Sequence, residues 1–191
     1  MTQNHLVEEL ERVKALGGLV LYSRDNPDQD PPKIVFETFQ RIVDAELPMK
    51  LLDEPHPAVA SGFKDNATSL MMASHAGVVE LVKDLIRRGA EIEARDADGY
   101  TALMYAANMG RDEVVDLLLQ AGADVNAMDN HQSTPVMFAA QHDHVSAVKR
   151  LIDARADLSI RGDHGLTALG FAKQNGHRKT RRILERAGAT P

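Results

Sequence analysis

The chain of 191 residues lacks cysteine and tryptophan, and aromatic residues make up only 4% of it. Without cysteine it has no disulfide framework, no thiolate metal site and no cysteine nucleophile. No apolar run reaches the roughly 18 residues that a transmembrane helix needs. The first residues, MTQNHLVEELERVKALGG, carry acids where a signal peptide has a basic region and an apolar core. We therefore expect a cytoplasmic protein.

The charge balance argues against polyanionic partners. The chain has 22 basic and 28 acidic residues, a net charge of −6, so we expect it to bind neither nucleic acid nor an anionic membrane. Residues 1–62 hold 6 basic and 11 acidic residues (−5), and the rest hold 16 and 17 (−1). Hydrophobic residues make up 43%, an ordinary share for a globular domain that buries a core.

The sequence repeats at a constant interval. Threonines recur every 33 residues, at Thr68, Thr101, Thr134 and Thr167. Each threonine is followed by an apolar residue two positions on, an alanine five positions on and a leucine seventeen positions on. Four positions after the leucine stand Gly89, Gly122, Arg155 and Gly188. A period of this length is typical of a solenoid built from small supersecondary units.

Each position of the repeat has a physical interpretation. A threonine caps the start of a short helix by accepting an orphan backbone N–H. The leucine and alanines then form one narrow apolar face, and small residues on it allow close helix packing. A glycine nine positions after most threonines ends this helix, and a longer apolar helix follows. Asp98-Gly99 marks a tight turn in the connecting stretch. The repeat therefore predicts helix, turn, helix and a β-turn finger.

The stretch DADGYTALMYAANMGRDEVVDLLLQAGADVNAMD, from Asp96 to Asp129, resembles the ankyrin repeat. The resemblance covers four units, residues 63–95, 96–128, 129–161 and 162–191. It implies an all-α ankyrin-repeat solenoid of helix pairs with β-turn fingers. It also implies a function in protein–protein interaction rather than catalysis.

The chain departs from the family pattern at two sets of positions. Met71, Met104, Met137 and Gly170 replace the histidine of the T-P-L-H motif. The hydrogen bonds of that histidine are therefore in doubt, and we expect packing of the flexible methionines in their place. The second set stands where glycine is expected and lies in residues 129–161, at Gln132, Asp143 and Arg155. We expect a left-handed backbone at Arg155, at a cost of about 1 kcal/mol.

Residues 1–62 do not repeat cleanly. Apolar residues at helical spacing predict a helix over 3–16, followed by an acidic linker to residue 32. Leu52 lies one repeat period before Leu85, so we interpret residues 33–62 as a degenerate capping repeat. The helix over 3–16 is expected either to pack on this helical N-terminal cap or to contact a partner.

The sequence carries no catalytic or metal-binding motif. It lacks a nucleophile elbow, a phosphate-binding glycine loop and a zinc-protease helix. His142 and His144 are two positions apart, which directs two helical side chains away from each other. His131 and His164 occupy one column of adjacent repeats, but no third ligand joins them. We expect no metal, no cofactor and no enzymatic activity.

The resemblance implies that partners bind in the concave groove, at the finger tips and at three positions of each short helix. Helical spacing also places these helix positions on one face, away from the core. The candidate contact residues are Met72, His75, Asp98, Tyr100, Tyr105, Asn108, Met109, His131, Phe138, Gln141, His142, His164, Leu166, Phe171 and Gln174. The aromatic rings at Tyr100, Tyr105, Phe138 and Phe171 would form an exposed patch suited to a binding hot spot. Alternatively, Phe138 and Phe171 pack between repeats.

The last predicted helix is strongly basic, with Arg178, Lys179, Arg181, Arg182 and Arg186. We interpret it as a solvated capping face, and a docking patch for an acidic partner is the alternative.

The sequence as a whole predicts a non-enzymatic, monomeric module that binds one partner protein. One alternative is an inhibitor or immunity-type protein that blocks a partner enzyme. Another is an adaptor that joins two proteins, one through the groove and one through residues 1–32.

Overall fold

The computed structural model describes residues 67–190, so the predictions for residues 1–32 and 33–62 lie outside the described residues. The described range contains eight helices in four consecutive pairs. The first member of each pair, the inner helix, is α4 (Ser69–Ala76), α6 (Ala102–Asn108), α8 (Pro135–Gln141) or α10 (Ala168–Gln174). The second member, the outer helix, is α5 (Val79–Arg87), α7 (Asp112–Gln120), α9 (Val145–Asp153) or α11 (Arg178–Arg186).

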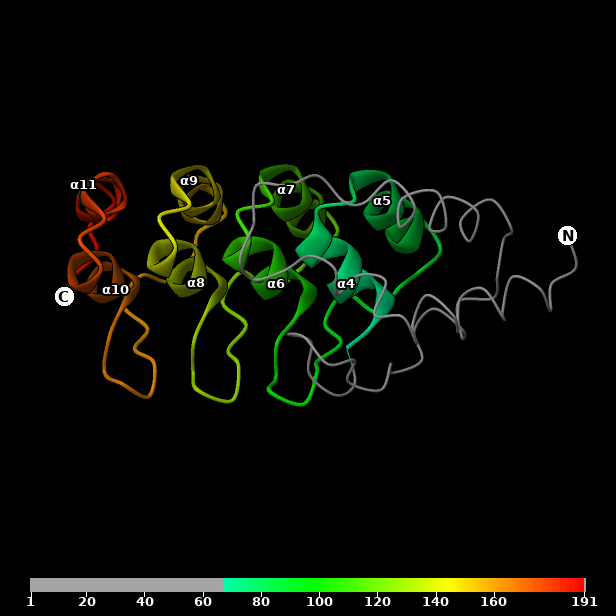
Figure 1. The fold of residues 1–191 in the computed structure, drawn as a ribbon, viewed down its shortest axis with the longest axis horizontal. Helices are drawn as coiled ribbons and strands as arrows, with labels where there is room; N and C mark the ends of the chain where they lie inside the picture. The colour runs from blue at the N-terminus through cyan, green and yellow to red at the C-terminus, as the bar shows by residue number, and fades with distance from the viewer. Residues whose placement is uncertain (1–66, 191) are drawn as a thin grey trace, which may run out of the picture.

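The helices form two parallel rows (Figure 1). Each inner helix packs on its own outer helix and on the inner helix of the next pair, and the outer helices contact one another in the same order. The connecting fingers extend beyond the inner row, on the side away from the outer helices (Figure 1). The elements of residues 67–190 are all helices, which confirms the predicted all-α repeat solenoid.

Threonine caps begin three of the four inner helices. The hydroxyls of Thr68, Thr101 and Thr167 each accept the backbone N–H three positions on, as the sequence predicts. Thr134 is different, because its side chain makes no capping bond at the start of α8. Pro135 occupies the first turn there, and the amide three positions after Thr134 donates to the Thr134 carbonyl instead. The capping prediction is therefore wrong for Thr134.

Methionine replaces the missing histidine in an unexpected way. Met71 and Met104 are fully buried, which fits the packing role expected of them. Their sulfur atoms also accept the backbone N–H of Thr68 and Thr101, at 3.4 and 3.5 Å. Sulfur is a weak acceptor. Each contact lies at the start of its own helix and does not reach the neighbouring repeat.

Left-handed backbone recurs where the sequence places glycine. Gly89, Gly122 and Gly188 have φ values of 88°, 91° and 87°. Within residues 67–190 the non-glycine residues with positive φ are Gln132, Asp143 and Arg155, at 59°, 58° and 68°. These are the three positions of residues 129–161 where the sequence lacks an expected glycine, and the left-handed prediction for Arg155 is confirmed.

The outward face of the fourth helix pair is polar. Lys173 and Arg181 are exposed, whereas Ala140 and Val148, at the equivalent positions of the third pair, are fully buried between repeats. Leu184 keeps the buried leucine position on the inward side of α11. Water can therefore cover this end of the stack without exposing an apolar core.

Candidate partner-binding surface

The inner helices and finger tips form one continuous side of the molecule, here called the inner face. It consists of the exposed parts of α4, α6, α8 and α10 with the fingers at 96–100, 129–133 and 162–166. All the candidate contact residues lie in these elements or directly beside them. The exposed ones are His131, His142, His164 and Gln174. The half-buried ones are Met72, His75, Asp98, Tyr100, Asn108, Met109, Gln141, Leu166 and Phe171.

Two of the predicted aromatic contacts are buried. Tyr105 is 4% exposed and Phe138 is 8% exposed. The expectation that four aromatic rings share an exposed patch is therefore wrong for these two residues. Their position on the inner helix directs them against the neighbouring finger, where Phe138 packs with Met104 and Ala127. For Phe138 the structure supports the alternative of packing between repeats.

A row of rings crosses the first three repeats beneath the inner face. The rings of His75 and Tyr105 have centroids 5.9 Å apart in an edge-to-face arrangement. Tyr100 lies 5.5 Å from Tyr105 and 5.0 Å from Phe138. Such pairs add about 0.5–1.5 kcal/mol each beyond the burial of their area. The row therefore supports Tyr100, a half-buried finger residue of the second of the four repeats.

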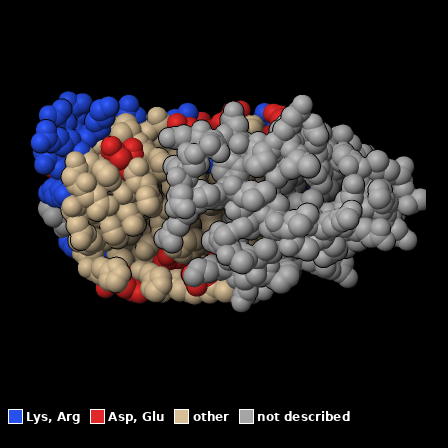
Figure 2. All heavy atoms as spheres, in the orientation of Figure 1, with Lys and Arg blue, Asp and Glu red and all other residues tan. Residues whose placement is uncertain are grey.

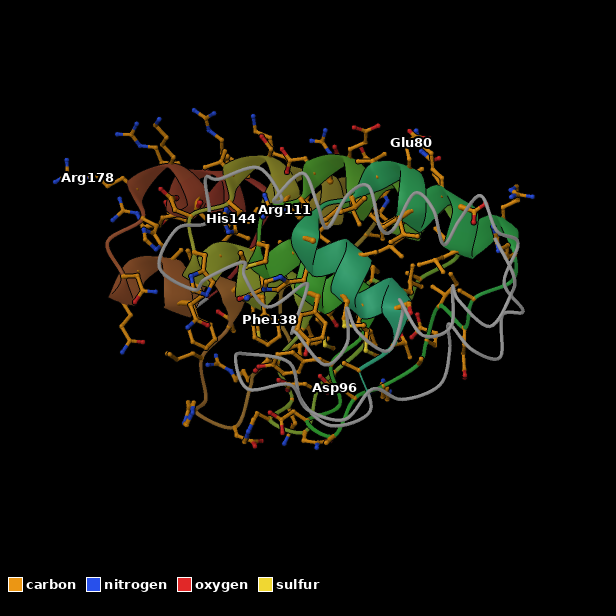
Figure 3. The ribbon with its side chains drawn as sticks, turned by 45° about the vertical axis from the view of Figure 1, so that its right-hand side comes forward. Glu80, Asp96, Arg111, Phe138, His144 and Arg178 are labelled. Atoms are coloured by element: carbon orange, nitrogen blue, oxygen red, sulfur yellow. The ribbon has the colours of Figure 1, made fainter. Side chains whose placement is uncertain are left out.

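Asp96 fixes the finger that carries Tyr100. It is buried, and its Oδ2 accepts the Tyr105 hydroxyl at 2.6 Å. Its Oδ1 accepts the backbone N–H groups of Asp98 and Tyr100 at 3.0 and 2.8 Å. Figure 3 shows Asp96 and Phe138 on the finger side of the inner helices. Hydrogen bonds to a carboxylate are strong, so Asp96 ties the finger to α6 and holds Tyr100 in place.

Burial keeps two rings of this face neutral. Burial, with the carboxylates of Asp129, Asp98 and Asp96, raises the pKa of Tyr100 to about 12. Burial, with the nearby Arg111 guanidinium, lowers the pKa of His75 to about 4. Both rings are therefore uncharged at neutral pH, and a partner can cover them without removing a charge from water.

In the next finger an aspartate carboxylate again accepts two backbone amides of the turn. Asp129 is buried, and its Oδ1 accepts the backbone N–H groups of His131 and Ser133 at 2.9 and 2.7 Å. In the last finger Gly162 takes this position. The sequence analysis missed the role of the two aspartates, although Asp96 and Asp129 occupy equivalent positions of adjacent repeats at the start of their turns.

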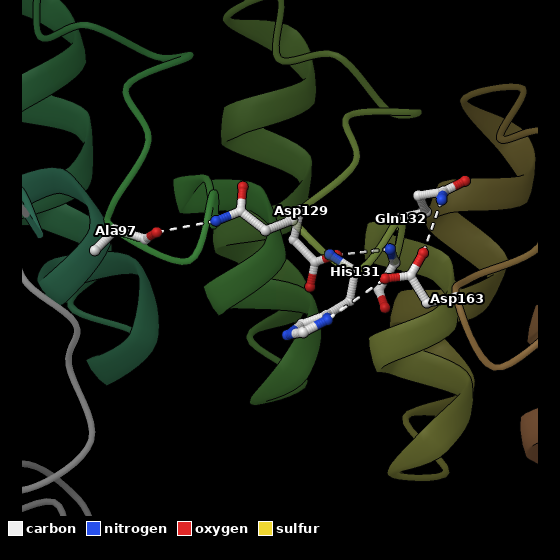
Figure 4. A network of polar contacts seen from close by, with 7 residues as sticks. Ala97, Asp129, His131, Gln132 and Asp163 are labelled. Atoms are coloured by element: carbon white, nitrogen blue, oxygen red, sulfur yellow. Dashed lines mark hydrogen bonds and ion pairs between the residues drawn. The ribbon is translucent and has the colours of Figure 1, made fainter.

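Side chains connect successive fingers (Figure 4). The Asn130 side-chain amide donates to the Ala97 carbonyl at 2.9 Å. The Gln132 amide donates to Asp163 Oδ1 at 2.7 Å, and His131 Nδ1 lies 3.6 Å from Asp163 Oδ2. The fingers therefore form a linked row, and the exposed tips lie at fixed positions along it.

A second set of unpredicted contacts joins the two helix rows. Arg111, His144 and His177 each stand ten positions after a repeat threonine. Their side chains reach backbone carbonyls of the preceding inner helix, which are those of His75, Asn108 and Gln141 at 3.0, 3.0 and 2.9 Å. Figure 3 shows Arg111 and His144 between the rows. These bonds satisfy carbonyls that a helix end leaves without an intrahelical partner.

Metal-binding clusters and membrane-spanning helices are both absent from residues 67–190. In residues 67–190, no group of three or more His, Asp or Glu side chains is placed to hold a metal ion. No helix in that range is long and apolar enough to cross a membrane.

Comparison with protein families agrees with the repeat geometry. A family model described as ankyrin repeats (3 copies) matches residues 44–129, and one described as ankyrin repeats (many copies) matches residues 118–172. The chain belongs to the ankyrin repeat family. Ankyrin repeats generally mediate protein–protein interaction and are typically not enzymes. A search of curated proteins found no significant match to the chain.

Proposed function

We propose that this ankyrin protein is a non-enzymatic module that binds one partner protein through its inner face. The observation that carries the proposal is the position of Tyr100. This residue is half-buried on that face, its ring packs against those of Tyr105 and Phe138, and Asp96 holds its backbone. A rigid aromatic side chain on a preorganised support suits an interface hot spot.

The side chains around Tyr100 support the same conclusion. Asn108, Gln141 and Gln174 present neutral amides on three successive inner helices, and Met109 adds an apolar side chain. Neutral polar and apolar groups can be buried against a protein at a lower cost than charges.

The outer helices α5, α7 and α9, in contrast, carry charges that pair with one another. The Arg150–Asp116 pair is separated by 2.9 Å and the Lys83–Glu80 pair by 2.7 Å. Covering these three helices would remove these pairs from water, which is costly. The inner face is therefore the favoured binding surface.

The proposal is tested on a partner captured from the source cell and measured by titration calorimetry. Replacing Tyr100→Ala should weaken binding roughly 30-fold, because truncating a hot-spot ring costs about 2 kcal/mol. The change also removes packing against Tyr105 and Phe138, so the melting temperature of the variant must be measured as well. The double variant Gln141→Ala/Gln174→Ala removes two side chains from the inner face and should weaken binding roughly threefold or more.

Lys149→Ala on α9 is the matched control, since this exposed residue lies on the outer row and should leave the affinity unchanged. Wild-type affinity in both inner-face variants would refute the proposal. A captured enzyme whose activity falls on binding would specify an inhibitor, and two partners captured together would specify an adaptor.

A further inference from the structure

The outer helix of the fourth repeat carries a dense basic face. Its exposed residues include Arg178, Lys179, Arg181, Arg182 and Arg186. Figure 2 shows their blue atoms gathered at the end of the stack where α11 lies. Residues 162–190 hold 6 basic and 2 acidic residues, a balance of +4 in a chain of net charge −6. We call the four residues Arg178, Lys179, Arg182 and Arg186 the basic face.

Most charges of this face act against the stability of its own helix, although Arg186 in the last turn favours it. Arg178 and Lys179 occupy the first turn of α11, which contains no acidic residue. Cations there oppose the positive end of the helix dipole. Arg182 also lies four positions from both Arg178 and Arg186, a spacing that brings like charges together. In α7 the first turn instead contains Asp112 and Glu113.

A helix that only shields the end of the stack from water requires polar residues, but it does not require several like charges at helical spacing. Exposed residues of mixed charge would protect the end of the stack equally well. Among the described residues, the acid that pairs with α11 is Glu185, whose Oε1 lies 3.6 Å from Arg181 Nε. The four cations of the basic face therefore repel one another, and an acidic ligand would relieve that repulsion.

We propose that the basic face docks an acidic peptide segment of a second protein, independently of the inner face. A peptide fits the size of the site, since the helix Arg178–Arg186 extends only about 13 Å. A long polyanion would also meet residues 96–128, which hold 1 basic and 6 acidic residues (−5) and would repel it. The sequence of α11, RKTRRILER, has no aromatic side chain on which a nucleic-acid base could stack.

The test uses the full chain and a fluorescein-labelled peptide of about ten Glu and Asp residues, long enough to extend along α11. The wild-type protein should bind this peptide, and the affinity should fall between about 50 and 300 mM salt because exposed charges are screened. The variant Arg178→Gln/Arg182→Gln should bind roughly fivefold or more weakly, since it removes two ion pairs. The matched control Lys149→Gln/Arg155→Gln removes the same charge from the adjacent outer helix and its C-terminal turn and should bind as wild type.

The melting temperature gives a second readout. Arg178→Gln/Arg182→Gln should melt at the same or a higher temperature at low salt, because it relieves repulsion, so weaker peptide binding could not be attributed to unfolding.

Equal binding by the wild type and Arg178→Gln/Arg182→Gln would overturn the proposal, as would an equal loss in the control. Tighter binding of a DNA duplex or of anionic lipid vesicles than of the peptide would overturn it in favour of that partner.

Discussion

The second and third repeats, residues 96–128 and 129–161, share one backbone but differ at three left-handed positions. The second repeat has Gly99, Gly110 and Gly122 there, and all three have positive φ. The third has Gln132, Asp143 and Arg155 at the equivalent positions, with the same backbone conformation. Non-glycine residues pay about 1 kcal/mol or more each for this conformation. The third repeat therefore carries strain that the second avoids.

The neighbouring repeat explains two of the three differences. A Cβ at Gly110 would lie 2.5 Å from Nδ1 of His144, and one at Gly99 would lie 2.7 Å from Oδ1 of Asn130. The second repeat therefore needs glycine both for its backbone and for close packing with the third.

In the third repeat, two of the side chains at these positions form hydrogen bonds. Asp143 Oδ1 accepts the buried Thr180 hydroxyl at 2.6 Å, and the Gln132 amide donates to Asp163 at 2.7 Å. Two of the three irregular residues of this repeat therefore bond to the fourth repeat. Arg155 is exposed, and the equivalent Gly122 has no neighbouring atom within 4 Å of where a Cβ would lie.

The largest effect is expected when the second repeat is given the aspartate of the third. Gly110→Asp should reduce the free energy of unfolding by about 2 kcal/mol or more, because backbone strain adds to a clash with the His144 ring. That ring would have to leave the Asn108 carbonyl, which it contacts at 3.0 Å. Urea denaturation measures the change.

Gly176→Asp is the control for this prediction. Gly176 occupies the same position of its repeat as Gly110 and has a φ of 74°, but a Cβ there would have no neighbouring atom within 4 Å. It should cost only the strain, about 1 kcal/mol. Equal losses in the two variants would show that packing against the next repeat does not decide where glycine is needed.

A smaller effect is expected when strain is removed from the third repeat. Arg155→Gly should raise the free energy of unfolding by up to about 1 kcal/mol, because glycine adopts the left-handed conformation without steric cost. The reverse change, Gly122→Arg, should lower it by a similar amount, since a Cβ there would have no neighbouring atom within 4 Å and the left-handed backbone would be strained. A clear fall in the urea midpoint of Arg155→Gly would show that Arg155 makes a stabilising contact.

The repeat fold could be predicted from sequence because its signals are local and periodic. Threonine, leucine, alanine and glycine recur at the same places in successive repeats, and each reports a cap, a core position or a left-handed turn. Positions on the inner face followed from helical spacing in the same way. The prediction failed at Tyr105 and Phe138, because burial of a ring depends on the neighbouring finger rather than on its own helix.

The polar contacts within and between repeats could not be predicted from the sequence either. Asp96 accepts three donors only because the finger brings Tyr105 and two turn amides to one carboxylate. Arg111 and His144 look like ordinary polar residues until the preceding helix end places a carbonyl beside each. The roles of Arg111 and His144 depend on the spacing of neighbouring repeats, which a single repeat does not encode.

Site-specific photocrosslinking in the source cell tests the proposed binding surface most directly. A photoreactive phenylalanine analogue would be placed at Gln141 on the inner face or at the exposed Gln120 on the outer helix α7. If the inner face binds the partner, Gln141 should give one dominant crosslinked protein and Gln120 should not give that product. The same crosslinked protein from Gln120, with none from Gln141, would contradict the proposal.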